Sequence, residues 1–302
     1  MFQSKKLFSK NISRKYFLEK CFLFPLNQQL HIKSKKYLLE KRRQLVVFSF
    51  DHIAHTINLN GLYEKESLDI LFEWLHFLKV DFSKSTAIDI GANIGNHSLY
   101  FSDLFEKVIS FEPSKKTFKV LSLNSELSDN IICFNIGLSD CKREGVLKTI
   151  KENIGGSYIS DVKSNNSEII KLEKLDSFKE FTNIKLIKID VEGHELKTIL
   201  GAQEIIKENM PIIIFEQQIS DFANGESSSV NQLKKIGYQD FAIIQKSPTH
   251  SNGLLNKFLV APLFTLIFGE KQTIQLVKNF EPNFYEFIIA IPYWLREKIK
   301  LI

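Results

Sequence analysis

The sequence predicts an α/β protein built on a Rossmann-like, mostly parallel sheet with helices on both faces. Three observations lead to this fold class. Short apolar runs recur along the chain, each is followed by a helical or turn-rich stretch, and the first run ends in a glycine-containing turn that opens a helix. Strands that are apolar at nearly every position are typical of a parallel sheet covered by helices. The expected strands are 86–90, 107–111, 130–135, 184–189, 211–215 and 238–244, with 285–291 as a further candidate.

The remaining segments set the domain organisation. Residues 67–80 carry leucines and a phenylalanine at three- and four-residue spacings, which predicts an amphipathic helix. Residues 145–150 are expected to form a hairpin strand, and residues 153–166, rich in Gly, Ser and Asn, a loop. We expect one domain over residues 51–302, with a basic N-terminal extension over residues 1–50 and a helical C-terminal insertion over residues 247–280. The apolar stretch 254–268 within it is expected to be buried as core or as an oligomer contact.

Composition excludes several classes of protein. The chain has 302 residues, 44% hydrophobic and 25% charged, which is typical of neither disordered nor fibrous chains. The longest uncharged apolar run, 258–268, is 11 residues long, whereas a membrane-spanning helix needs about 20. The first 30 residues also make a poor secretory signal. Three cysteines without a CxxC pair indicate neither a disulfide framework nor a zinc site. We therefore expect a cytoplasmic chain.

Charge is distributed unevenly along the chain. Residues 1–43 carry 12 Lys and Arg against Glu19 and Glu40, a net charge of +10, and the rest carries 28 against 33, a net charge of −5. Such an arm could be solvated, could contact an anionic membrane surface or a protein partner, or could bind nucleic acid. Nucleic acid is the least favoured of the three, because only five of the 40 basic residues are arginine, the better phosphate ligand.

The turn after the first expected strand indicates a cofactor. Its glycines are Gly91 and Gly95, and the positions that a dinucleotide fingerprint would need as further glycines are occupied by Asn93 and Asn96. No Gly-Lys-Ser/Thr follows, so a P-loop is excluded. A cofactor without phosphates fits better, with its cationic end attracted by Asp89 beneath the turn. S-adenosylmethionine is such a cofactor.

The second expected strand supports this interpretation. It ends at Glu112, about twenty residues after the turn, where an acidic residue can accept both ribose hydroxyls of a nucleoside. Either feature alone could be structural, since glycines also serve tight packing and strand ends often carry exposed charges. Together, in order and on successive strands, they favour a cofactor site.

Five motifs resemble the FkbM-type class I S-adenosylmethionine-dependent methyltransferases. They are DIGANIG at 89–95, FEP at 111–113, NIGLSD at 135–140, LIKIDVEGHELKTILGA at 186–202 and PIIIFE at 211–216. The resemblance covers roughly residues 55–245, and its most specific element is KIDVEGHE followed by LxGA. It implies a methyltransferase that uses S-adenosylmethionine, with a sugar or glycan precursor as acceptor in polysaccharide biosynthesis.

The resemblance also implies site residues. Asp89, Gly91, Asn93 and Gly95 would surround the methionine end of the cofactor, Glu112 the ribose, and the backbone near Leu138 the adenine edge. Tyr63 and Glu64 match a Tyr-Glu pair that precedes the first strand in the family, which would let Glu64 reach the cofactor's amino group. The cofactor-binding set is therefore Glu64, Asp89, Gly91, Asn93, Gly95, Glu112 and Leu138.

A polar cluster follows the fourth expected strand, beside the first. Methyl transfer to oxygen needs an aligned acceptor hydroxyl and a base for its proton. Asp190 is the first candidate for either role, His194 the second because imidazole titrates near neutral pH, and Glu216, at the end of the next strand, the third. Acidic residues in a first helical turn also stabilise the helix dipole. Because a helix start explains the cluster, we expect no metal.

The sequence thus predicts an S-adenosylmethionine-dependent O-methyltransferase acting on a small molecule such as a sugar. Two alternatives stay open. One is a noncatalytic S-adenosylmethionine-binding scaffold that acts through the basic arm. The other is an RNA ribose methyltransferase, whereas methylation of exocyclic amines is disfavoured because the fourth strand ends in IDVEG instead of an Asn/Asp-Pro-Pro-aromatic signature. The oligomeric state is not predicted.

Overall fold

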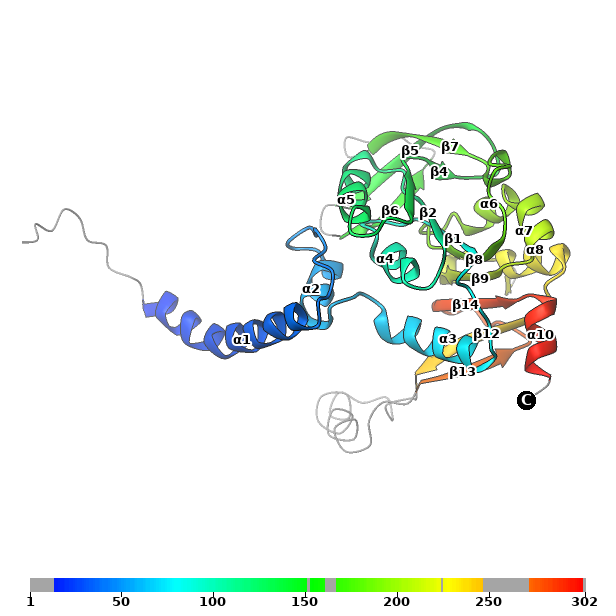
Figure 1. The fold of residues 1–302 in the computed structure, drawn as a ribbon. Coiled ribbons are helices and arrows are strands. Elements are labelled where there is room, and N and C mark those ends of the chain that lie inside the picture. Colours follow the sequence, from blue (N-terminus) through cyan, green and yellow to red (C-terminus); the bar gives the residue numbers. More distant parts are fainter. Residues whose placement is uncertain (1–13, 151–152, 161–166, 224, 247–271, 301–302) are drawn as a thin grey trace, which may run out of the picture.

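A single large sheet organises the molecule (Figure 1). The computed structural model describes residues 14–150, 153–160, 167–223, 225–246 and 272–300. Within those residues the sheet has eight strands. In spatial order they are β13 (Gln272–Val277), β12 (Asp240–Lys246), β14 (Tyr285–Ile291), β9 (Ile212–Gln217), β8 (Ile184–Ile189), β1 (Thr86–Ile90), β2 (Lys107–Phe111) and β3 (Ile131–Phe134).

The order of the strands creates a crevice beside β1. From β3 to β9 every neighbouring pair is parallel, and β14 runs antiparallel to both β9 and β12. The chain leaves β1 for β2 and β3 on one side and later returns to place β8 and β9 on the other. Ligands of open α/β sheets bind outside the carboxyl ends of the strands at such a switch point. The sequence-based prediction of a mostly parallel sheet is confirmed.

Helices cover both faces, as expected for strands that are apolar on both sides. On one face lie α6 (Glu195–Leu200), α7 (Gln203–Asn209) and α8 (Ser228–Ile236), and their buried side chains include Ile199, Ile205 and Leu233. On the other lie α3 (Lys65–Phe77), α4 (Asn96–Ser102) and α10 (Tyr293–Ile299), with Leu71, Phe101 and Leu295 buried. Helix α5 (Lys115–Ser125) lies beside β3.

A smaller sheet stands over the carboxyl end of the large one and corrects one expectation. Its strands, in spatial order, are β4 (Gly137–Leu138), β7 (Ser167–Glu173), β5 (Arg143–Ile150) and β6 (Asn153–Ser160). The loop expected over 153–166 is therefore wrong for its first half, because β6 pairs antiparallel with β5. Glycine and serine are poor strand formers, and only the pairing with β5 explains this strand. Residues 161–166 lie outside the described residues. Strands β10 (Phe222–Ala223) and β11 (Glu226–Ser227) pair antiparallel.

The helical insertion expected over 247–280 also needs correction. Residues 272–277 form β13, which pairs antiparallel with β12 at the edge of the large sheet. Its alternation of half-buried and exposed side chains suits an edge strand covered on one face. The apolar stretch 254–268 lies outside the described residues.

The N-terminal extension begins with a long helix that projects from the body (Figure 1). Helix α1 (Arg14–Leu39) precedes α2 (His52–Asn60), and Tyr37 Oη and Lys33 Nζ both donate to the Leu59 carbonyl, at 2.7 and 2.8 Å. Arg43, near the end of the extension, forms an ion pair of 2.7 Å with Asp103 of the body. No helix in the described ranges combines the length and apolar character needed to cross a bilayer.

Candidate functional site

A pocket opens at the carboxyl ends of β1, β2 and β8, under the small sheet. It contains about 640 Å³ of empty space, part of it open to solvent. Five residues predicted from the sequence line it, namely Gly91, Asn93, Glu112, Leu138 and Asp190. We call this space the nucleoside pocket. Its walls also carry the apolar side chains of Phe111, Ile136, Leu147, Ile159 and Val191.

The glycine turn at the base of the nucleoside pocket has no room for a side chain at its first position. Gly91 has a φ of +75°, and a Cβ there would lie 1.8 Å from the carbonyl oxygen of Asp190. Asn93 follows with a φ of +50°, and its backbone N–H donates to Glu112 Oε2 at 3.1 Å. Among the described residues, the buried Oδ1 of Asn93 has no hydrogen-bond partner. A ligand that donates a hydrogen bond would satisfy this atom.

Glu112 is the buried acid of the pocket, with 8% of its surface exposed. Its two oxygens accept from the backbone N–H groups of Asn93 and Ser114, at 3.1 and 2.8 Å. Burial raises the pKa of Glu112 to about 7, although these two donors oppose the shift. Each carboxylate oxygen can accept a second hydrogen bond. Glu112 can therefore hold two adjacent hydroxyls of a ribose, as the sequence predicts.

The raised pKa of Glu112 predicts that ligand affinity depends on pH. Hydroxyl donors favour the ionised carboxylate, so ligand binding should lower this pKa and release a proton near pH 7. The affinity for S-adenosylhomocysteine should then rise about tenfold between pH 6 and pH 8. Titration calorimetry in buffers of different ionisation enthalpy measures both effects. Glu112→Gln should bind more weakly and lose the rise, whereas Glu126→Gln, at an exposed site, should behave like the unmodified protein. A rise that survives in Glu112→Gln would contradict the assignment.

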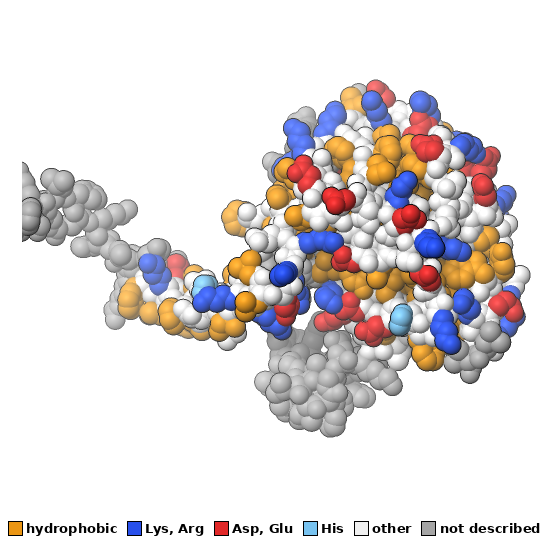
Figure 2. Space-filling model, viewed as in Figure 1, with side chains coloured by type: hydrophobic (Ala, Val, Ile, Leu, Met, Phe, Trp, Pro, Cys, Tyr) orange, Lys and Arg blue, Asp and Glu red, His pale blue; other side chains and the backbone are white. Residues whose placement is uncertain are grey.

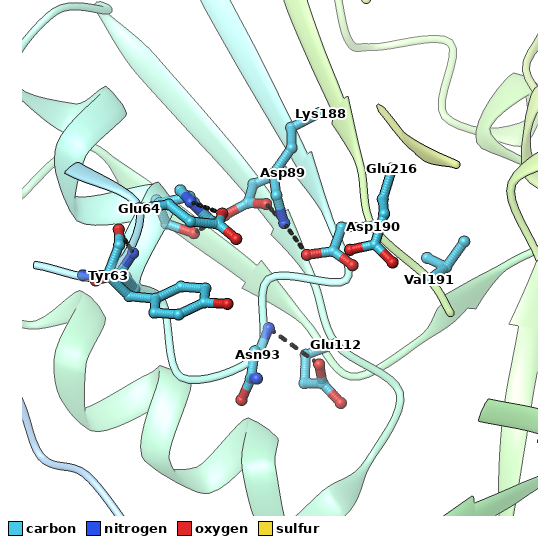
Figure 3. A network of polar contacts seen from close by, with 12 residues as sticks. Tyr63, Glu64, Asp89, Asn93, Glu112, Lys188, Asp190, Val191 and Glu216 are labelled. Carbon is cyan, nitrogen blue, oxygen red and sulfur yellow. Dashed lines mark hydrogen bonds and ion pairs between the residues drawn. The ribbon is translucent and has the colours of Figure 1, made fainter. Parts of the chain in front are cut away.

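A buried lysine joins the ends of β1 and β8 (Figure 3). Lys188 is 2% exposed, and its Nζ lies 3.0 Å from Asp190 Oδ2 and 3.5 Å from Asp89 Oδ1. Burial opposes its charge, but Asp190, Asp89 and Glu64 together raise the pKa of Lys188. The lysine is therefore charged and fixes the position of Asp190. Sequence analysis missed this residue, which is one of two lysines in the strand and the one that is buried.

Asp89 and Gly95 lie beneath the nucleoside pocket and are not part of its lining. Asp89 is fully buried and accepts a hydrogen bond of 2.6 Å from Ser98 Oγ on α4. Gly95 precedes the same helix with a φ of +89°, and a Cβ there would lie 2.8 Å from Leu121. In the structure Asp89 balances the charge of Lys188, and Gly95 lets α4 approach α5. Their expected contacts with the cofactor stay predictions.

A second, narrow space adjoins the first at Asp190, which lines both; it contains about 200 Å³ of empty space and no room for a water-sized body. We call it the acceptor cavity; Glu64, Lys188, Glu216 and Glu286 also line it. Figure 3 shows the side chains of Asp190 and Glu216 lying close together at neighbouring strand ends. Asp190 thus lies where the nucleoside pocket meets a narrow space lined by further carboxylates.

Glu64 lies in the acceptor cavity beside a histidine that sequence analysis did not single out. Its Oε2 is 3.1 Å from Nε2 of the buried His97 on α4. Burial alone would raise the pKa of Glu64, but the hydrogen bond and charge of His97, with the charge of Lys188, lower it below the usual value. The carboxylate is thus ionised. It could attract a ligand's ammonium group, although it does not line the nucleoside pocket.

Glu216 has the opposite electrostatic environment. Burial and the negative charges of Asp190 and Glu192 raise the pKa of Glu216 to about 8. Gln218 Nε2 bridges the two glutamates, at 2.7 Å from Glu192 Oε2 and 3.4 Å from Glu216 Oε1. A carboxyl group with a pKa near the working pH is suited to accept a proton during a reaction.

His194 points away from both cavities. Its Nε2 lies 2.9 Å from Ser139 Oγ, and the side chain is 6% exposed. The turn before it contains Glu192 and Gly193, both with positive φ, which redirects the chain between Asp190 and α6. The structure thus brings Asp190 and Glu216 together and separates His194 from them. No group of three or more His, Cys, Asp or Glu side chains in the described ranges is arranged to hold a metal ion.

Comparison with known proteins identifies the family. The sequence matches the methyltransferase FkbM domain over residues 89–239, half of the chain. It is 32% identical over 117 residues to the hexuronic acid methyltransferase AglP of Haloferax volcanii, covering 37% of this chain and 48% of that protein. It is 27% identical over 155 residues to the methyltransferase sdnD of Sordaria araneosa, covering 39% and 60%. The chain thus matches about half the length of these curated relatives.

A solved structure of an FkbM methyltransferase, from Methylobacillus flagellatus KT, is also similar. It has 17% sequence identity and a TM-score of 0.37, over 74% of this chain and 56% of that one. The family assignment follows from the sequence match, which includes the glycine turn, Glu112 and the polar cluster after β8. The expected resemblance is confirmed, and this chain belongs to the FkbM methyltransferase family.

Proposed function

We propose that this chain is an S-adenosylmethionine-dependent O-methyltransferase whose acceptor is a sugar or glycan precursor in polysaccharide biosynthesis. One observation carries the proposal. The nucleoside pocket and the acceptor cavity meet at Asp190, which is the place where a methyl donor and an acceptor would face each other. The two spaces differ in character, since the first combines apolar walls with one buried acid and the second is lined by carboxylates.

The residues of the nucleoside pocket suit the methyl donor. Glu112 would hold the ribose hydroxyls, the apolar walls would hold the adenine, and the backbone at Gly91 would allow close approach of the methionine end. The unpartnered Oδ1 of Asn93 offers a further acceptor. S-adenosylmethionine, when bound, supplies an electrophilic methyl group on a sulfonium.

Two carboxyl groups would act on the acceptor, one to orient its hydroxyl and one to take its proton. Asp190, fixed by Lys188 at 3.0 Å, would accept a hydrogen bond from the acceptor hydroxyl and so orient its oxygen. Glu216, with its pKa raised to about 8, would take the proton as the hydroxyl oxygen becomes methylated. The wider groove that Glu64, Glu216 and Glu286 also line has room for a saccharide, whose several hydroxyls could donate to these carboxylates. The relationship to a hexuronic acid methyltransferase supports the same substrate class.

This division predicts how turnover depends on pH. Below pH 8 Glu216 carries its own proton and cannot accept another, so kcat should rise with pH towards a plateau above pH 8. Glu216→Gln mimics the protonated form. The variant should therefore match the unmodified enzyme at pH 6.5 and turn over about tenfold more slowly at pH 9, without the rise. An unchanged pH profile in Glu216→Gln would move the base elsewhere.

Calorimetry and product analysis test the proposed function. The full chain should bind S-adenosylmethionine and S-adenosylhomocysteine, and with a saccharide acceptor it should form a methyl ether detectable by NMR. Absence of cofactor binding would overturn the enzyme proposal and favour a scaffold that acts through the basic extension. Tight, salt-resistant RNA binding would instead favour the RNA alternative, because binding through phosphates alone weakens as salt is added.

A further inference from the structure

A larger groove between the N-terminal extension and the body adjoins the acceptor cavity. The groove contains about 1390 Å³ of empty space, against about 640 Å³ in the nucleoside pocket. Glu64, Glu216 and Glu286 line both the groove and the acceptor cavity, so the two adjoin at these side chains. A molecule that presents one hydroxyl to Asp190 would extend along this groove.

The two sides of the groove carry opposite charges. The body side, which we call the inner end, contributes the three glutamates, and the extension side, which we call the outer end, contributes Lys33, Lys36 and Arg42. Figure 2 shows basic and acidic side chains gathered where the projecting extension meets the body. Tyr37, Tyr63 and Phe284 also line the groove, and the Arg42 guanidinium lies over the Tyr37 ring, 4.3 Å from its centroid. Lys65 and Glu66 add one charge of each sign.

The cations at the outer end are only partly compensated within the described structure. Glu40 contacts both Lys36, at 3.7 Å, and Arg42, at 2.6 Å, while Lys33 donates to a backbone carbonyl. Glu40 therefore pairs with two of the three cations, and Lys33 is bound to an uncharged carbonyl. Lys36 is two-thirds exposed and makes its one ion pair at the long limit, which leaves its ammonium available to a ligand.

We propose that this groove binds the acceptor and selects an anionic saccharide, one whose carboxylate or phosphate lies on Lys33, Lys36 and Arg42 while its hydroxyls reach the inner carboxylates. The inference rests on the proposed function and adds the chemical class of the acceptor. It gives part of the basic extension a role in substrate recognition. A polyanion such as RNA fits poorly, because its further phosphates would meet the three glutamates at the inner end.

Binding to the full chain saturated with S-adenosylhomocysteine tests the inference. The calorimetric probes are methyl glucoside, which is neutral, methyl glucuronide, which carries a carboxylate, and glucose 1-phosphate. At least one anionic probe should bind about tenfold or more tightly than the neutral one, and the comparison of the two shows which anion the groove prefers. Added salt should reduce the difference in affinity between the anionic probes and the neutral probe, because salt screens the charges of the groove.

Variants at Lys36 test whether the outer end of the groove binds the anionic group of the probe. Lys36→Ala should lower affinity for the preferred anionic probe about fivefold and leave methyl glucoside unchanged. Lys36→Glu should lower it further and improve binding of methyl glucosaminide, whose ammonium would meet the new carboxylate. Lys35→Ala is the matched control, since Lys35 lies on the same helix with an exposed side chain outside the groove lining.

The outcomes separate this inference from the proposed function. Equal affinity for the neutral and both anionic probes would overturn the inference, as would a Lys36→Ala variant that behaves like Lys35→Ala. The proposed function would survive either result if methyl glucoside were methylated. A chain that fails to bind S-adenosylhomocysteine at all would overturn the proposed function instead.

Discussion

Gly91→Ala should reduce the affinity for S-adenosylhomocysteine by more than 100-fold and lower the stability of the fold. The added Cβ would stand 1.8 Å from the carbonyl oxygen and 2.8 Å from the carbonyl carbon of Asp190. Both are backbone atoms, so no side-chain rotation relieves the clash. Asp190 N donates to the Ile90 carbonyl and Gly91 N to the Phe111 carbonyl, each at 3.0 Å. Relief would therefore require the ends of β1, β2 and β8 to move apart at the nucleoside pocket.

A matched variant separates this clash from backbone strain. Gly225 has a φ of +80°, close to the +75° of Gly91, but a Cβ there would meet no atom within 4 Å. Gly225→Ala therefore measures the cost of a left-handed alanine alone, about 1 kcal/mol. Thermal unfolding should show a loss of at least about 2 kcal/mol for Gly91→Ala. If the two variants unfolded alike and Gly91→Ala kept full affinity, the ligand would not approach the turn at Gly91.

The strands of the sheet were readily predicted because their signal is local. Four expected ranges, 86–90, 107–111, 184–189 and 285–291, agree with β1, β2, β8 and β14 as observed. Each is a nearly continuous apolar run with polar or turn residues at its ends. Buried strands of this kind need no information from distant segments.

Strands and contacts that depend on distant partners were not predicted. Strand β6 exists because it pairs with β5, and β13 because it pairs with β12. The role of Lys188 depends on its ion pair with Asp89, which lies some hundred positions earlier in the chain. A linear sequence pattern does not show this pair. The groove likewise joins α1 to Glu216 and Glu286, which are far apart in the sequence.

The polar cluster after β8 shows the same limit within five residues. Asp190 was the first candidate and His194 the second, and the positive φ angles at Glu192 and Gly193 send them in different directions. Asp190 stays at the strand end between two cavities, and His194 turns to Ser139. Motif spacing predicted the location of the site but not the direction of each side chain.

Asp190→Asn should separate chemistry from cofactor binding. The amide keeps the shape of the side chain but loses the charge that pairs with Lys188 at 3.0 Å and that would orient the acceptor hydroxyl. Turnover should therefore fall by about 100-fold or more. The affinity for S-adenosylhomocysteine should change little, because Glu112 and Gly91 are untouched and Asp89 still compensates Lys188. Glu112→Gln should fail in the opposite way, with weaker cofactor binding.

The pH dependence of the residual activity of Asp190→Asn provides a second test. The charge of Asp190 helps to raise the pKa of Glu216 to about 8, so its removal should lower that pKa and shift the rising limb of the pH profile to lower pH. If Asp190 had only a structural role, its replacement would not shift the pH at which turnover rises. If Asp190→Asn lost cofactor binding as badly as Glu112→Gln, Asp190 would belong to the methionine end of the nucleoside pocket. Full turnover in Asp190→Asn would instead show that the cluster after β8 serves packing and capping, and that the chemistry takes place elsewhere.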